Sequence, residues 1–207
     1  MDSLIDYNTM NKIVLEIGVK HFLNPKIRNI PKIKNYFKKQ INNIGDVRLK
    51  NKLEKNFLLF SSNGDKEGVK YLLNIGINPN ITDIEGETSL HKAVWTRQID
   101  IIEILLKAGV DINSKDRWGN TIMMWATSRG FRNIVEFLIK ENANINLKSK
   151  WGWTALMNSV YYGHINIVNI LIKAGANIKD KNIEGLTALQ IAKKCNQVEI
   201  INLLQNL

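Results

Sequence analysis

The sequence predicts an all-α repeat solenoid, and three observations support this fold class. Four threonines recur at intervals of 33 residues, namely Thr88, Thr121, Thr154 and Thr187. A glycine lies two residues before each threonine, and an apolar residue lies two residues after it. An apolar pattern with the i, i+1, i+4, i+5 spacing of one helical face then follows, as in residues 101–106. A fixed period of this length is the signature of stacked two-helix units.

The period divides the chain into a leading cap and five units. In chain order we expect a basic N-terminal helical cap at 1–50, a degenerate first repeat at 51–83, repeats at 84–116, 117–149 and 150–182, and a C-terminal capping repeat at 183–207. In the degenerate unit the second helix keeps its pattern, whereas the hairpin signals are lost. In the last unit Lys193 and Gln205 place polar residues on a face that earlier units make largely apolar, as a terminal repeat requires.

Residues 88–93 read Thr-Ser-Leu-His-Lys-Ala, and the same positions return at 121–126, 154–159 and 187–192. This pattern resembles the T-P-L-H-x-A signature of the ankyrin repeat family, and Gly163-His164 resembles its Gly-His step. No unit keeps the proline and only His91 keeps the histidine, which predicts a weaker polar network between neighbouring units. The resemblance implies a stack of helix-turn-helix units with β-hairpin loops. It also implies that partners dock on a concave surface of hairpin tips and first helices.

Composition predicts a soluble, cytoplasmic protein. The N-terminus carries acids where a signal peptide needs lysines, and no apolar run reaches the ~18–20 residues of a transmembrane helix. The single cysteine, Cys195, excludes an intramolecular disulfide framework. Isoleucine, asparagine and lysine number 30, 27 and 23, which is typical of A/T-rich genomes such as those of intracellular bacteria and large viruses. Delivery into a host cell and a host-cell partner are therefore further hypotheses.

The sequence contains no set of residues typical of catalysis. His91 and His164 occupy signature positions at which the resemblance implies a structural role. No nucleophile elbow, phosphate-binding glycine loop or zinc-binding His-Glu-x-x-His motif is present. We therefore predict a non-enzymatic protein without catalytic residues, cofactor, metal or small-molecule substrate.

The positions that the repeat leaves variable indicate a binding surface for another protein. These predicted partner-binding residues are Glu85, Trp95, Arg117, Trp118, Trp125, Arg129, Lys150, Trp151, Trp153, Tyr161 and Tyr162. Exposed tryptophan beside arginine and tyrosine is typical of binding hot spots. The basic residues favour an acidic segment in the partner, and Trp118 and Trp151 should be neighbours on adjacent tips. The alternative is a structural role, in which the rings stack on one another or cover gaps between units.

A second function is predicted by the basic N-terminal segment, residues 20–39, which could bind nucleic acid or an anionic membrane. Its basic residues are Lys20, Lys26, Arg28, Lys32, Lys34, Lys38 and Lys39, interleaved with Phe22, Tyr36 and Phe37. Such binding would depend strongly on salt. However, Phe22 and Phe37 lie on apolar helical stripes, and no nucleic-acid motif is present. A helix is predicted to begin near Pro31 and to end near Gly45.

Overall fold

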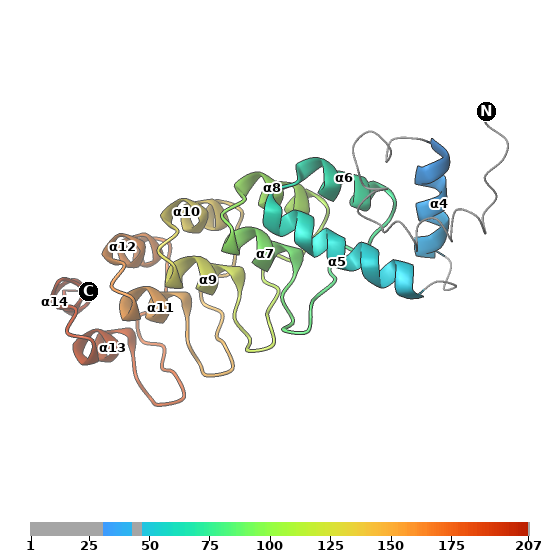
Figure 1. Cartoon of the computed structure of the whole chain (residues 1–207). Helices are drawn as coiled ribbons and strands as arrows, with labels where there is room; N and C mark the ends of the chain where they lie inside the picture. The colour runs from blue at the N-terminus through green and yellow to red at the C-terminus, as the bar shows by residue number, and fades with distance from the viewer. Residues whose placement is uncertain (1–30, 43–46, 207) are drawn as a thin grey trace.

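A computed structural model describes residues 31–42 and 47–206 of the chain. Its helices are α4 (Pro31–Asn42), α5 (Val47–Asn63), α6 (Lys66–Asn74), α7 (Ser89–Trp95), α8 (Ile99–Lys107), α9 (Ile122–Ser128), α10 (Arg132–Lys140), α11 (Ala155–Tyr161), α12 (Ile165–Lys173), α13 (Ala188–Lys194) and α14 (Val198–Gln205). From α5 onward they alternate between two rows, and long loops project from the row that contains α7, α9, α11 and α13 (Figure 1). The predicted helical solenoid is confirmed.

The repeated threonines fix where the first helix of each clear unit begins. Thr121 is the N-cap of α9, and its side chain accepts a hydrogen bond from the backbone N–H of Met124. Thr88, Thr154 and Thr187 cap α7, α11 and α13 in the same way. Gly119 is left-handed, with φ +79°, and a Cβ there would lie 2.9 Å from the backbone nitrogen of Lys150. The glycine is therefore required by the close approach of the next hairpin.

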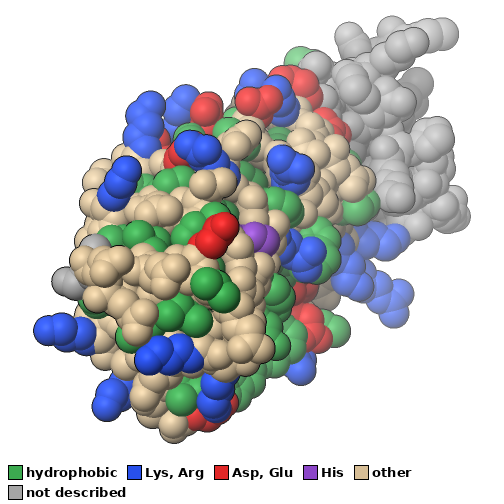
Figure 2. All heavy atoms as spheres, turned by 90° about the vertical axis from the view of Figure 1, so that its left-hand side faces the viewer, with side chains coloured by type: hydrophobic (Ala, Val, Ile, Leu, Met, Phe, Trp, Pro, Cys, Tyr) green, Lys and Arg blue, Asp and Glu red, His purple; other side chains and the backbone are tan. Residues whose placement is uncertain are grey.

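A continuous apolar core runs through the stack between the two helix rows. Leu90, Met123 and Leu156 share one position of the repeat, and each is at most 1% exposed. Leu189 has the same position in the last unit but is only half-buried. Figure 2 views this end of the stack and shows apolar side chains among polar ones, with lysines and arginines around them. The last unit therefore leaves part of the stacking surface exposed.

The helices before the first clear repeat differ in detail from the predicted division. Helix α5 packs against α7 and begins at Val47, so the expected boundary between residues 50 and 51 falls inside it. Its buried side chains are Leu49, Leu53, Phe57 and Ser61. Helix α6 follows as the second helix of this unit, with Asp65 as its N-cap. An extended helix thus takes the place of a hairpin and short first helix.

Part of the basic N-terminal segment is described in α4. This helix begins at Pro31, where the sequence predicted a helix start, and ends at Asn42. Tyr36 is buried, so it is unavailable as an exposed ring on a basic face. Residues 20–30 and Gly45 lie outside the described residues, and the nucleic-acid or membrane function of segment 20–39 stays a prediction.

Candidate protein-binding groove

The indole of Trp125 is positioned by a buried carboxylate. Trp125 lies on α9 at the position that Lys92 occupies on α7. Its Nε1 donates a hydrogen bond of 3.1 Å to Asp116, which is 5% exposed. The other oxygen of Asp116 accepts the backbone N–H groups of Trp118 and Asn120 at 2.9 and 2.8 Å. One side chain therefore closes the hairpin and fixes the ring that follows it.

Four side chains from α7, α9 and the C-cap of α9 form what we call the Trp95 cluster: His91, Trp95, Trp125 and Arg129. The ring of Trp125 meets those of Trp95 and His91 edge to face, at centroid distances of 5.4 and 5.3 Å. The guanidinium carbon of Arg129 lies 3.3 Å from the centroid of the Trp95 ring. Burial lowers the pKa of His91, so this ring is neutral at pH 7. Trp95 nevertheless stays 48% exposed.

Three members of the Trp95 cluster, namely Trp95, Trp125 and Arg129, line a pocket, which we call the groove. It has a volume of about 220 Å³, and α7, α9 and α11 all contribute to it. Its lining residues include Trp95, Met124, Trp125, Arg129, Asn158 and Tyr162. Tyr162, the C-cap residue of α11, is 54% exposed. The groove thus combines partly exposed rings with a cation and side-chain amides.

A second aromatic cluster continues from the groove into the next unit. The rings of Trp153 and Tyr161 meet edge to face at 5.6 Å, and those of Tyr161 and Tyr162 at 5.0 Å. Tyr162 also stacks with His164 at 6.3 Å. Both tyrosines are about half exposed, at 48% and 54%, so ring-to-ring contact has not removed them from the surface.

The hairpin tips form a separate, neighbouring surface. The Arg117 guanidinium pairs with Glu85 at 2.9 Å and lies 4.5 Å from the centroid of the Trp118 ring. Successive tips are joined through the backbone, since Lys150 N–H donates to the Trp118 carbonyl at 2.9 Å. This places Trp118 next to the tip that carries Trp151, which is 44% exposed. Among the described residues, however, no ring contact joins these two indoles.

The structure therefore divides the predicted binding residues between two places. Trp95, Trp125, Arg129 and Tyr162 meet at the groove, with Trp153 and Tyr161 beside it. Glu85, Arg117, Trp118, Lys150 and Trp151 lie on the tips. The rings of both clusters contact one another, as the structural alternative expects, yet Trp95, Tyr161 and Tyr162 remain about half exposed.

Sequence reasoning missed Met124, Asn158 and Arg97, and a sequence signal for them exists. Asn158 donates a hydrogen bond of 3.4 Å to the Met124 carbonyl, 34 residues earlier. Arg129 also follows Trp95 by 34 residues, and Phe131 follows Arg97 by the same number. Contacts between neighbouring units thus recur at one period plus one residue, whereas the sequence prediction rested only on positions one period apart.

In the first clear unit an ion cluster forms around Lys92, at the position that Trp125 occupies in the next unit. Lys92 pairs with Asp83 at 2.6 Å and also with Glu87. Burial alone would lower the pKa of Lys92, but the hydrogen bonds with the two carboxylates outweigh it and raise that pKa. Burial likewise opposes ionisation of Asp83, yet the bond from Lys92 and two backbone N–H groups lower its pKa. Both groups are therefore charged at neutral pH, and they hold the first hairpin to α7.

Comparison with protein families identifies the repeats. A model described as ankyrin repeats (3 copies) matches residues 32–116 and 123–207, and a second, ankyrin repeats (many copies), matches 97–139. The chain belongs to the ankyrin repeat family. Ankyrin repeats are in general protein–protein interaction modules and are typically non-enzymatic, and no enzyme domain was found. A comparison with curated proteins gave no match.

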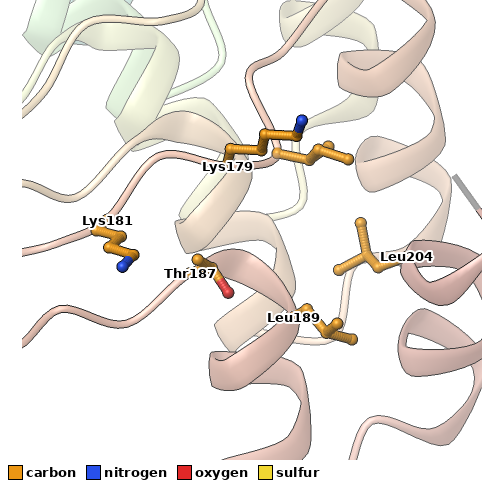
Figure 3. Close-up of a pocket in the computed structure, with 6 residues that line it drawn as sticks. Lys179, Lys181, Thr187, Leu189 and Leu204 are labelled. Atoms are coloured by element: carbon orange, nitrogen blue, oxygen red, sulfur yellow. The ribbon is translucent and has the colours of Figure 1, made fainter.

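A larger pocket lies at the C-terminal end of the ankyrin stack. Its volume is about 360 Å³, and Figure 3 shows Leu189 and Leu204 projecting into it below Lys179. The residues of earlier repeats at the Leu189 position are covered by the unit that follows them. This pocket is therefore an uncovered stacking surface, with a shape set by packing between repeats.

The described residues, 31–42 and 47–206, contain no group of three or more His, Cys, Asp or Glu side chains placed to hold a metal ion. None of their helices has both the length and the apolar character needed to cross a membrane. His164, a predicted structural histidine, lies within 3.3 Å of the Ser128 carbonyl, which links two neighbouring units.

Proposed function

We propose that this protein is a non-enzymatic scaffold that binds a peptide loop or helix of a partner protein in the groove. The observation that carries the proposal is the pocket of about 220 Å³ with Trp95 and Tyr162, each about half exposed, at its edges. Large rings that stay exposed around a pocket are typical of interaction sites. The tip residues Arg117, Trp118, Lys150 and Trp151 form a neighbouring surface outside the proposed binding site.

Rigid presentation of side chains is the proposed mechanism. Trp125 is held by Asp116, and Trp95 is held between Trp125 and Arg129. These rings are already ordered before a ligand arrives, so binding costs little side-chain entropy. An apolar side chain of the partner would enter between Trp95 and Tyr162. The amide of Asn158 and the cation of Arg129 would meet its polar neighbours.

Selection from a displayed library of random linear peptides tests the proposal. Peptides selected on the wild-type chain should bind the Trp95→Ala and Tyr162→Ala variants at least about tenfold more weakly, as hot-spot rings require. Trp151→Ala is the matched control, because this indole has nearly the same exposure, 44% against 48% for Trp95, but lies on a tip. It should weaken binding by less than about threefold.

Thermal unfolding of each variant separates binding from folding. Tyr162→Ala truncates a ring that is 54% exposed, so its melting temperature should stay within a few degrees of the wild type. Peptides that bind wild type and Tyr162→Ala equally, or that are lost only with Trp151→Ala, would place the binding surface outside the groove and overturn the proposal.

A further inference from the structure

Two arginines stack reciprocally between the ankyrin repeats that flank the groove. Arg129, after α9, covers the ring of Trp95 at 3.3 Å. Arg97, two residues after Trp95, lies over the ring of Phe131, with its guanidinium carbon 5.1 Å from the ring centroid. Phe131 in turn lies two residues after Arg129. Each repeat thus supplies one aromatic ring and one guanidinium to the other. The four side chains form a ridge beside the groove, which we call the arginine ridge.

Arg97 occupies a backbone position that disfavours it. Its φ is +62°, in the left-handed region, and the same position holds Gly130 and Gly163 in the next two repeats, with φ of +71° and +72°. The last repeat has Asn196 there, a residue type that tolerates this conformation. An arginine with a Cβ is strained at this position. Glycine or asparagine would avoid this strain, which the exposed stack on Phe131 offsets only in part, so stability alone does not account for an arginine here.

The guanidiniums of the arginine ridge also lack acidic partners. Both residues are exposed, and no acidic side chain within the described ranges 31–42 and 47–206 lies at ion-pair distance from either. Other arginines nearby are paired: Arg117 with Glu85 and Arg132 with Glu136. A guanidinium stacked on a ring keeps its N–H donors at its edge, where they can meet a carboxylate in bidentate geometry.

A second pocket adjoins the arginine ridge. It has a volume of about 330 Å³ and is lined by Arg97, Ile99, Phe131, Asn133 and Ile134. The groove has Arg129 in its lining and this pocket has Arg97, so each pocket includes one of the two cations. A peptide with an apolar residue in the groove would carry its next residues over the ridge.

We propose that the arginine ridge selects an acidic peptide, whose carboxylates bind Arg97 and Arg129 while an adjacent apolar side chain fills the groove. The inference rests on the proposed function and names the chemistry of the partner segment. Charge complementarity carries it, because two exposed and pre-oriented cations without acids of their own require anions on whatever covers them. Arg97 thereby has a role in selecting acidic peptides over neutral or basic ones.

The same peptide library, sequenced before and after selection, tests this assignment. Peptides selected on the wild-type chain should be enriched in Asp and Glu next to an apolar residue. Selection on the double variant Arg97→Asn, Arg129→Gln should lose this enrichment. The matched control is Lys107→Gln, Lys140→Gln, which removes two exposed charges from the same two repeats at the ends of α8 and α10 and should keep it.

Affinity for one selected acidic peptide, followed by fluorescence anisotropy, gives the second readout. Arg97→Asn should weaken binding about tenfold, and the weakening should shrink at high salt, where exposed charges are screened. Its melting temperature should not fall by more than a few degrees, since Asn196 already adopts this conformation in the last repeat. An unchanged affinity would overturn the assignment.

The two proposals fail in different ways. Selected peptides that depend on Trp95 but show no excess of acids would overturn the acidic preference and leave the groove in place. Acidic peptides that bind Trp95→Ala as well as they bind the wild type would overturn the groove. Acidic enrichment lost equally in the lysine control would show that the overall charge of +10, and not the arginine ridge, attracts them.

Discussion

The hydrogen bond between Trp125 and Asp116 gives the sharpest test of how the groove is held. The perturbation is Asp116→Asn, and the chain itself shows what asparagine does at this position. Asn182, two repeats later, accepts two backbone N–H groups of its hairpin at 3.0 and 2.9 Å, as Asp116 does. Its Nδ2 has no hydrogen-bond partner, and Ile191 stands where Trp125 stands. Asparagine therefore preserves the hairpin but turns a donor toward the indole N–H.

The magnitude follows from the chemistry of that contact. A hydrogen bond to a charged group contributes about 1.5–3 kcal/mol, and Asp116→Asn replaces it with two opposed, buried donors. The free energy of unfolding should therefore fall by about 2–3 kcal/mol. In a Trp125→Phe background no indole N–H remains. Asn120 Nδ2 also donates to this oxygen of Asp116, at 3.1 Å, but its amide can turn its own oxygen toward the new donor, so the same change should cost only about 0–1 kcal/mol. The coupling energy of the double-mutant cycle should be about 2 kcal/mol.

Urea unfolding followed by far-ultraviolet circular dichroism measures all four corners of the cycle, because this signal does not depend on the indole that is removed. The urea dependence of the unfolding free energy must stay the same in the four proteins, or else the unfolding transition has changed its character. A coupling below about 0.5 kcal/mol would refute the reasoning, since Asp116 would then stabilise the hairpin alone and leave Trp125 to packing.

Two further predictions concern the stack itself. Burial lowers the pKa of His91, so the unfolded chain binds more protons than the folded one as pH falls below about 6.5, and stability falls with pH. His91→Gln copies the capping box that Gln190 forms in the last repeat. This substitution should remove the His91 contribution to the decline in melting temperature at low pH. Gly119→Ala should cost more than Gly185→Ala, by about 1–2 kcal/mol in urea unfolding, because only the first Cβ meets Lys150. Equal costs would show that left-handed strain alone matters.

The helical stack was predictable because its determinants are local. A threonine cap, a left-handed glycine and an apolar helical face act within a few residues, so a period of 33 carries them unchanged along the chain. The ends were harder. Helix α5 begins at Val47 and buries Leu49 and Leu53, residues for which the 33-residue pattern contains no information.

The groove was predictable in composition but not in geometry. The sequence indicated that Trp95, Trp118 and Trp151 belong to variable positions, yet only side-chain partners decide which of them meet. Trp118 lies under Arg117, whereas Trp95 lies under Arg129 from the next repeat. Which arginine reaches which ring depends on the offset between adjacent units, and a comparison of equivalent positions cannot supply that offset.

One position of the repeat shows how the stack separates stability from recognition. Lys92, Trp125, Asn158 and Ile191 follow one another at this position, on nearly the same backbone. Lys92 is held by two carboxylates and Trp125 by one, so in both repeats a side chain joins the hairpin to its first helix. The exposed part of the side chain differs completely, from a cation to an indole to an amide. Binding character can therefore change here at little cost in stability, because the hairpin and helix backbone that carry the position stay the same.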